Sequence, residues 1–409
     1  MKLSGIESVS VSKKTFIITN FNEFTSFYKN LKIKDGKLSK CLYKRQIGDI
    51  GYNLTVKNVY ELDGKTYFVT GDRVYLFNGT GVQRLTFYSG ETAGIFSVIY
   101  AGVKRTLMLN KGGSQFLDGD KKAVQIPFKK HAEVVGDKMF LGEGSALIYG
   151  YTTDLSGFSE LGKQIILPTD AGEIIALIKD GKELLIFCSL AVFRLTTFGE
   201  GVDFKLDRLN LPRLNLLEGT VVSLGDRVAF IDGNKLCTLK GDSINSVDTA
   251  LSIDRLDVIK ECVSFKGKYV LPFEYGGEKF AYIIDVKGGD EQVLSIPSAI
   301  GEEGTYVVND KIYRIDQIEG EPCGSALYES VCTDFCSPKN KALTNVYVDC
   351  DQSAELKLSS AYFDKKFDIS ASTRPKKCNL SARKFAFSLS ADIPFNAQKI
   401  IFEYRIKGE

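Results

Sequence analysis

Short apolar runs separated by glycine-centred turns dominate the hydrophobic pattern of this 409-residue chain. The runs are four to eight residues long and rich in Val, Ile, Tyr, Phe and Thr, which is typical of β-strands. Helical periodicity is scarce, and its best candidate, residues 21–28, is short. The pattern therefore predicts an all-β fold. Seven turn residues each stand just before an apolar run: Gly64, Gly102, Gly136, Gly181, Gly225, Gly267 and Asn309.

These turns recur at a steady interval. From Gly136 onward they are 45, 44, 42 and 42 residues apart, and each interval holds several short strands. The first unit shows four, at residues 57–60, 66–69, 74–77 and 82–85. A period of about 40–45 residues built from four strands is typical of β-propeller blades. Seven anchors predict about seven blades, and six blades remain an alternative.

The blade period stops at Asn309, and a Pro/Gly-bearing junction follows at Gly320–Gly324. Beyond it, alternating apolar and polar residues predict a small C-terminal β-sandwich. We therefore expect three parts: 1–55 as an N-terminal arm with closing strands, 56–321 as the β-propeller, and 322–409 as the β-sandwich. Propellers commonly close by joining strands from both chain ends. The run Thr15–Thr19 is the expected N-terminal donor.

Composition narrows the chemistry only a little. The net charge of +2 argues neither for nor against nucleic-acid binding. The nine cysteines are odd in number and irregularly spaced, which favours reduced thiols. Cys332 and Cys336 have a spacing that zinc ligands use, but no His lies nearby, so buried free thiols are favoured over a metal site. We expect neither a metal nor a cofactor.

Few residues are suited to catalysis. His131 is the only His, follows two lysines, and is expected at the surface. Trp is absent, and the acidic residues form no distinctive cluster along the sequence. We therefore predict that the chain is not an enzyme. A propeller hydrolase would need paired carboxylates at the central channel.

One N-terminal segment is unusually basic. It is a candidate docking arm or nucleic-acid contact. The alternative, which we favour, is the solvated face of a strand pair around the Asp35-Gly36 turn. The candidate residues are Lys29, Lys32, Lys34, Lys37, Lys40, Lys44 and Arg45.

Two stretches resemble β-propeller virion proteins of tailed bacteriophages. The first is residues 28–38 followed by Lys44-Arg45, which matches a strand pair of the form Asn-φ-x-φ-x-x-Gly-x-φ and a basic residue before the first blade. The second is residues 328–338 and 341–348, which resembles the segment linking propeller to sandwich. Residues 400–406, near the end of the chain, resemble the corresponding part of these proteins as well. Tyr328 stands where Trp is common, and Cys336 where Gly is common.

The resemblance implies a non-catalytic structural component of the tail, neck or nozzle ring around the DNA channel. It implies copies of itself in a ring, neighbouring tail, adaptor or portal proteins, and non-specific contact with passing DNA as partners. The expected location is the virion, assembled in the bacterial host cytoplasm, with no membrane span. It assigns no individual functional residue. A receptor-binding propeller that recognises a host-surface glycan or protein is the alternative, and a propeller hydrolase is a third hypothesis.

Overall fold

The computed structural model describes residues 13–87, 90–119, 123–159, 164–197, 204–258, 261–296, 299–316, 320–370 and 374–407. Across these residues the regular structure consists of β-strands and four short 3₁₀ turns: η1 (Phe21–Phe24), η2 (Leu155–Ser159), η3 (Thr169–Ala171) and η4 (Ile253–Arg255). None of the helical turns described is long and apolar enough to cross a membrane. The chain divides into two compact units, a β-propeller and a β-sandwich, which are described separately.

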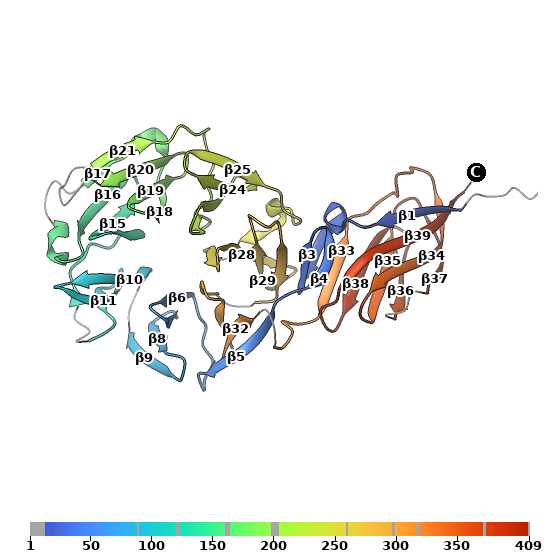
Figure 1. Cartoon of the computed structure of the whole chain (residues 1–409), viewed down its shortest axis with the longest axis horizontal. Helices are drawn as coiled ribbons and strands as arrows, with labels where there is room; N and C mark the ends of the chain where they lie inside the picture. The colour runs from blue at the N-terminus through green and yellow to red at the C-terminus, as the bar shows by residue number, and fades with distance from the viewer. Residues whose placement is uncertain are drawn as a thin grey trace, which may run out of the picture. The chain divides into compact units, whose positions relative to one another are not determined.

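The propeller comprises Lys44–Lys287 and Ile296–Gly320. Its small antiparallel sheets follow one another around a ring (Figure 1). The first five blades have four strands each: β6 (Asn58–Leu62), β7 (Lys65–Val69), β8 (Arg73–Phe77) and β9 (Val82–Phe87); β10 (Thr92–Tyr100), β11 (Val103–Asn110), β12 (Ser114–Phe116) and β13 (Ala123–Val124); β14 (His131–Val135), β15 (Lys138–Glu143), β16 (Ala146–Tyr151) and β17 (Gln164–Ile166); β18 (Ile174–Asp180), β19 (Glu183–Cys188), β20 (Val192–Thr197) and β21 (Phe204–Arg208); β22 (Val222–Ser223), β23 (Val228–Asp232), β24 (Lys235–Lys240) and β25 (Ser243–Val247).

The last two blades are less regular. In the sixth, two short strands pair with the same neighbour: β26 (Asp257–Val258) and β27 (Val263–Phe265) both pair with β28 (Lys268–Tyr275), which pairs with β29 (Glu278–Ile284). The seventh joins β31 (Thr305–Val308) and β32 (Lys311–Asp316) to the N-terminal strand β5 (Tyr43–Asp49). The described residues thus form seven blades, and strands from both ends of the propeller sequence close the ring.

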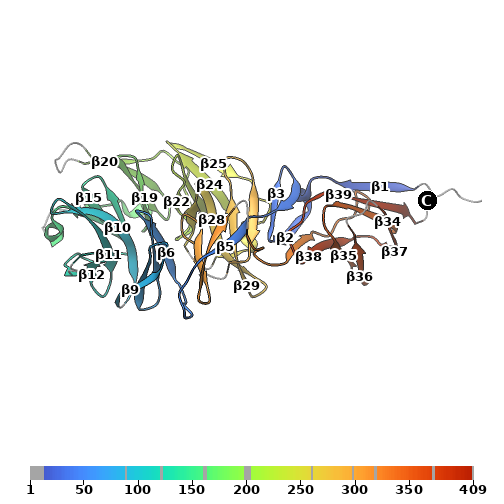
Figure 2. The same ribbon diagram turned by 60° about the horizontal axis from the view of Figure 1, so that its bottom comes forward.

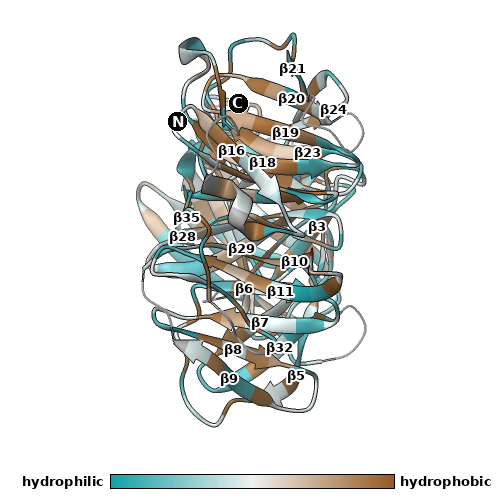
Figure 3. Ribbon diagram, turned by 90° about the vertical axis from the view of Figure 1, so that its left-hand side faces the viewer, coloured by the Kyte–Doolittle hydropathy of each residue, from teal (hydrophilic) through white to brown (hydrophobic). Residues whose placement is uncertain are grey.

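Turn chemistry explains why the blades form where the spacing predicts them. At Asp63-Gly64, between β6 and β7, both residues have positive φ, 53° and 73°. A type I′ turn requires this conformation, and its twist matches that of the paired strands. Figure 3 shows the blade strands β16, β18 and β19 coloured mainly as hydrophobic, as expected for sheets that are covered on both faces.

The propeller core consists of apolar layers between neighbouring blades. Phe140 and Leu184, for example, belong to one layer between the third and fourth blades. Another layer joins Val307 and Ile312 of the seventh blade to Phe68 and Phe77 of the first. At that closure Gly48 is required, because a Cβ there would lie 2.9 Å from the Phe77 ring. The first and last blades therefore pack directly against each other.

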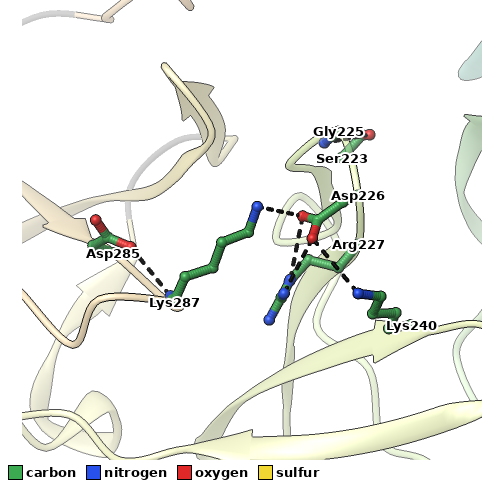
Figure 4. A network of polar contacts seen from close by, with 7 residues as sticks. All are labelled: Ser223, Gly225, Asp226, Arg227, Lys240, Asp285 and Lys287. Atoms are coloured by element: carbon green, nitrogen blue, oxygen red, sulfur yellow. Dashed lines mark hydrogen bonds and ion pairs between the residues drawn. The ribbon is translucent and has the colours of Figure 1, made fainter.

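An ion cluster links the fifth and sixth blades at the surface (Figure 4). The carboxylate of Asp226 contacts Arg227 at 3.1 Å, Lys287 at 2.8 Å and Lys240 at 3.9 Å. Hydrogen bonds from Arg227 and Lys287 hold the pKa of Asp226 below its usual range. Because the carboxylate is exposed, salt screens this cluster and its contribution to stability is small.

The sandwich comprises Met1–Tyr43, Gly288–Ser295 and Glu321–Glu409, of which the described residues form two antiparallel sheets. Figure 2 shows these sheets as two layers. One contains β30 (Glu291–Leu294), β3 (Leu31–Lys34), β4 (Lys37–Lys40), β39 (Ala397–Ile406), β34 (Lys341–Cys350) and β37 (Lys376–Ala382), with β1 (Lys14–Ile18) beside β39; the other contains β2 (Thr25–Lys29), β33 (Ala326–Ser330), β38 (Ala386–Ala391), β35 (Ala354–Ser360) and β36 (Phe363–Ile369).

Aromatic side chains fill the sandwich core. Phe335 is 2% exposed, and its ring stacks on Phe16 at 4.7 Å, Phe402 at 4.9 Å and Phe385 at 5.5 Å between centroids. Phe16 comes from β1 and Phe402 from β39. The cluster therefore holds the N-terminal strand to the C-terminal half of the unit.

Two buried polar side chains complete the sandwich. Lys341 is 0% exposed, and its ammonium donates to the carbonyl oxygens of Ser337, Lys339 and Arg383. Burial lowers the pKa of this lysine. Asn30 is 1% exposed; its amide donates to Ser295 Oγ and to the Ser325 carbonyl, and its Oδ1 accepts from the Ser295 N–H. Asn30 thereby joins all three segments of the unit.

The structure corrects the predicted role of the N-terminus. The run Thr15–Thr19 does not close the propeller: β1 pairs with β39 in register from Lys14–Tyr404 to Ile18–Ile400. The closing strand is β5. Residues 1–55 are thus not a single arm, because the unit boundary falls after Tyr43. The reason is that alternation identifies a strand but not its partner, and β39 offers an apolar edge that β1 covers.

Two smaller expectations change as well. The helical candidate at 21–28 is one 3₁₀ turn, η1, followed by strand β2. The C-terminal unit is not independent of the N-terminus, since β1, β2, β3 and β4 all belong to it. Cleavage near residue 321 would therefore not release a complete domain.

Truncation tests this arrangement. We expect deletion of residues 1–20 to expose the β39 edge and remove Phe16 from the aromatic cluster, so that β39 and β34 lose amide-exchange protection. Hydrogen–deuterium exchange with mass spectrometry measures this, with a 1–12 deletion as control. Loss of protection confined to β31 and β32 would contradict the strand assignment.

Replacement of Asn30 tests the polar junction. Asn30→Gly suits the positive φ of 52° but leaves the Ser295 N–H and Ser325 carbonyl without their side-chain partner. Each buried polar group left unpaired costs about 1–3 kcal/mol. We expect a lower free energy of unfolding for the sandwich in urea, and a variant as stable as the parent protein would refute the role of Asn30.

Candidate functional site

The central channel of the propeller brings together titratable side chains from several blades. One cavity of about 290 Å³ is lined by β6 and by Pro272, Ala299, Ile300 and Glu302, among others. A second, of about 150 Å³, is lined by β18, by residues 130–132, and by Gly219 and Val221. Both are lined by Glu261, so they are neighbouring parts of one channel.

Three glutamates line the larger cavity: Glu61 on β6, Glu261 before β27, and Glu302 before β31. Glu61 accepts a hydrogen bond from the Glu303 N–H. Burial raises the pKa of all three carboxyls, and the charge of Glu61 raises that of Glu302 further. The wall of this cavity therefore carries several carboxyl groups, and neighbouring cations compensate their charge only in part.

A fourth glutamate shares this environment. Glu133, on β14, accepts hydrogen bonds from the Val134 N–H at 2.8 Å and from the Lys179 N–H at 3.4 Å. Burial raises its pKa, and the charge of Glu302 contributes in the same direction. The backbone donors only partly compensate for the lost hydration.

His131 lies in this channel instead of at the open surface expected from its lysine neighbours. Its side chain is 15% exposed, and its Nε2 lies 3.3 Å from Glu218 Oε1. The same oxygen is 2.6 Å from the Lys130 ammonium. Burial lowers the pKa of His131, although Glu218 opposes the effect. At neutral pH the imidazole is consequently uncharged, and Lys130 neutralises Glu218.

The sequence did not reveal the carboxylates as a group because they are far apart along the chain. A positional signal exists for two of them: Glu61 and Glu133 each stand three residues before the turn glycine of their unit. Equivalent positions in blades that surround one axis face the same channel. Glu261 and Glu302 lie outside this register, and nothing in the sequence marks them.

The basic segment is divided between the two units. Lys29, Lys32, Lys34, Lys37 and Lys40 belong to the sandwich, whereas Lys44 and Arg45 lie on β5 of the propeller. Ion pairs join Lys32 to Asp290, Lys40 to Asp351, and Arg45 to Asp316. The Lys44 ammonium lies 4.8 Å above the Tyr313 ring. A docking or nucleic-acid role for these residues stays a prediction.

The described cysteines and acidic groups form no cluster of metal-ligating side chains. All nine thiols are free, and Cys332 and Cys336 are exposed. Among the described residues, no three His, Cys, Asp or Glu side chains have a geometry that would hold a metal ion. Burial raises the pKa of Cys188, Cys262 and Cys378 to about 12, so these thiols are unreactive at neutral pH.

No protein-family model matches the chain, and no curated protein matches its sequence. Solved structures with a similar arrangement include PorZ of the Porphyromonas gingivalis type-IX secretion system, at 14% identity and a TM-score of 0.41, covering 80% of this chain and 46% of that one. The AfRom2 CNH domain (10%, 0.44, covering 68% and 100%) and the Neurospora crassa Pan2 WD40 domain (10%, 0.44, covering 68% and 98%) are further examples.

These similarities are too low to support an argument about function. The fold rests on the strand pairing described above, and the chain spans less than half the length of the PorZ chain that it matches.

The channel carboxylates make stability depend on pH. A carboxyl whose pKa is raised in the folded state binds protons more tightly there. Its ionisation adds no penalty when both states are protonated, and the folded state loses stability as pH rises from the unfolded-state pKa through the folded-state pKa. We expect Glu261→Gln to raise the propeller's melting temperature at pH 7.5 and to have little effect near pH 4. Each unit of raised pKa corresponds to about 1.4 kcal/mol. Calorimetry at both pH values checks this, and equal effects at the two would refute it.

Proposed function

We propose that this chain is a non-catalytic structural component of a tailed-phage virion, part of a tail, neck or nozzle ring around the DNA channel. The proposal starts from the sequence resemblance. It is supported by one observation: the two resembling stretches, some 300 residues apart, meet in the sandwich. Strand β2 pairs with β33 at Tyr28–Tyr328 and Lys29–Leu327, and Asn30 bonds to Ser325.

The residues of those stretches have architectural roles. Tyr328 is fully buried and its hydroxyl donates to the Phe21 carbonyl. Ser330 Oγ accepts from the Phe387 N–H, and Thr333 exchanges backbone hydrogen bonds with Phe385. Side chains that hold strands together at both ends of a chain suit a rigid building block of a particle.

A hydrolase is the competing function that the channel favours most. A propeller hydrolase needs carboxylates at the central channel, and the channel contains several glutamates. Their pKa values are raised, which is typical of residues that act as general acids. The larger cavity, however, is about 290 Å³, at the lower end for small-molecule sites. Buried carboxylates that line a narrow propeller axis also need no reaction to explain them.

Receptor binding is the other alternative. It calls for aromatic side chains gathered on one face of the propeller. The exposed aromatic residues of the described propeller are Tyr52, 48% exposed, and Tyr275, 39% exposed. They lie in different blades, so nothing in the described surface favours this function.

Cryo-electron microscopy of the parent particle tests the proposal. We expect several symmetry-related copies around the central axis of the tail or neck. A soluble monomer with glycosidase or esterase turnover that Glu61→Gln abolishes would refute it and support the hydrolase. Placement at a fibre tip in contact with host receptors would instead support receptor binding.

A further inference from the structure

A basic stripe that differs from the predicted N-terminal segment follows one edge of the sandwich. Residues 374–384 contain five basic and no acidic residues. They surround β37, which pairs with β34 on one side and has no strand on the other among the described residues. The stripe therefore has both positive charge and an open strand edge.

The side chains of β37 alternate as an edge strand of a sandwich requires. Cys378 and Ala382 are buried, whereas Lys377, Asn379 and Ser381 are exposed. Arg374 precedes the strand, and Arg383 and Lys384 follow it, all three exposed. From β36, the Lys365 ammonium donates to the Cys378 carbonyl at 3.2 Å and adds positive charge at the middle of the strand.

The basic residues around β37 differ from those of the predicted N-terminal segment in their ion pairs. Within the described residues, no carboxylate lies within ion-pair distance of Arg374, Lys377, Arg383 or Lys384. Lys32, Lys40 and Arg45 of the N-terminal segment each have such a partner. Lys376 is excluded from the stripe, because it lines a groove with Glu355 and Asp368.

We propose that this stripe, Arg374, Lys377, Arg383 and Lys384 along β37, binds the phosphate backbone of duplex DNA without reading its sequence. The choice of DNA rests on the proposed function. A seven-residue strand is about 23 Å long, and each DNA strand carries a phosphate every 3.4 Å of helix axis, so several phosphates lie within reach. Phosphate oxygens usually accept hydrogen bonds from arginine guanidinium groups, from amide and hydroxyl side chains, and from free backbone N–H groups.

Fluorescence anisotropy of the full chain with a labelled 30-base-pair duplex tests the proposal. Three to four phosphate contacts predict about 40- to 150-fold weaker binding at 200 mM than at 50 mM salt. We expect Lys377→Glu/Lys384→Glu to weaken binding at least tenfold and to reduce the logarithmic salt slope by about two. The matched control, Lys182→Glu/Lys311→Glu, changes the net charge equally at two exposed positions of the propeller and should bind like the parent.

No binding at 50 mM salt would overturn the inference. Equal losses in both double variants would also overturn it, by showing an effect of bulk charge alone. Tighter binding to phosphatidylserine vesicles than to DNA would assign the stripe to a membrane surface instead. A chain that occupies the virion axis but fails this assay refutes only the stripe, whereas DNA binding by a chain absent from the axis refutes only the virion role.

Discussion

The architecture depends on a side-chain amide that holds three separate parts of the chain together. Asn30 bonds to Ser295 and Ser325, and its own N–H donates to the Val293 carbonyl. Its buried donors and acceptor must all be satisfied, because an unpaired buried polar group costs more than a hydrogen bond contributes. The segments that flank the propeller insertions must therefore meet at one point. Along the chain, the propeller segments alternate with the sandwich segments: the sandwich comprises residues before, between and after them.

This arrangement explains how the sheet edges are managed. The propeller closes with β5, which begins at Tyr43, directly where the N-terminal part of the sandwich ends. Strand β1 covers the edge of β39, and the aromatic cluster around Phe335 fixes it there. Of the sandwich edges, β36 carries Lys365 and Lys366, and β37 carries Lys377. Charged edges resist pairing with other strands, so such positions stay available for ligands.

Much of the propeller could be predicted from sequence because its signals are local. A turn such as Asp63-Gly64 fixes a hairpin, and repeating it fixes the blades. Strand partners were harder: β1 reads as a strand of either unit, since alternation reports one buried face and not which sheet provides it. The channel carboxylates were harder still. Glu61 and Glu302 lie at opposite ends of the propeller sequence, and only closure of the ring brings them to one cavity.

The distribution of charge differs between the two units. The propeller axis presents carboxylates whose pKa values are raised mainly because the carboxyls are buried. Such a wall repels a polyanion, so the axis of a single propeller is unsuited to hold DNA. The sandwich instead carries its unpaired lysines and arginines on an exposed strand edge, where phosphate can reach them. If the chain lines a DNA channel, electrostatics therefore favours a channel formed between copies, with sandwich edges at its surface, over one through each propeller.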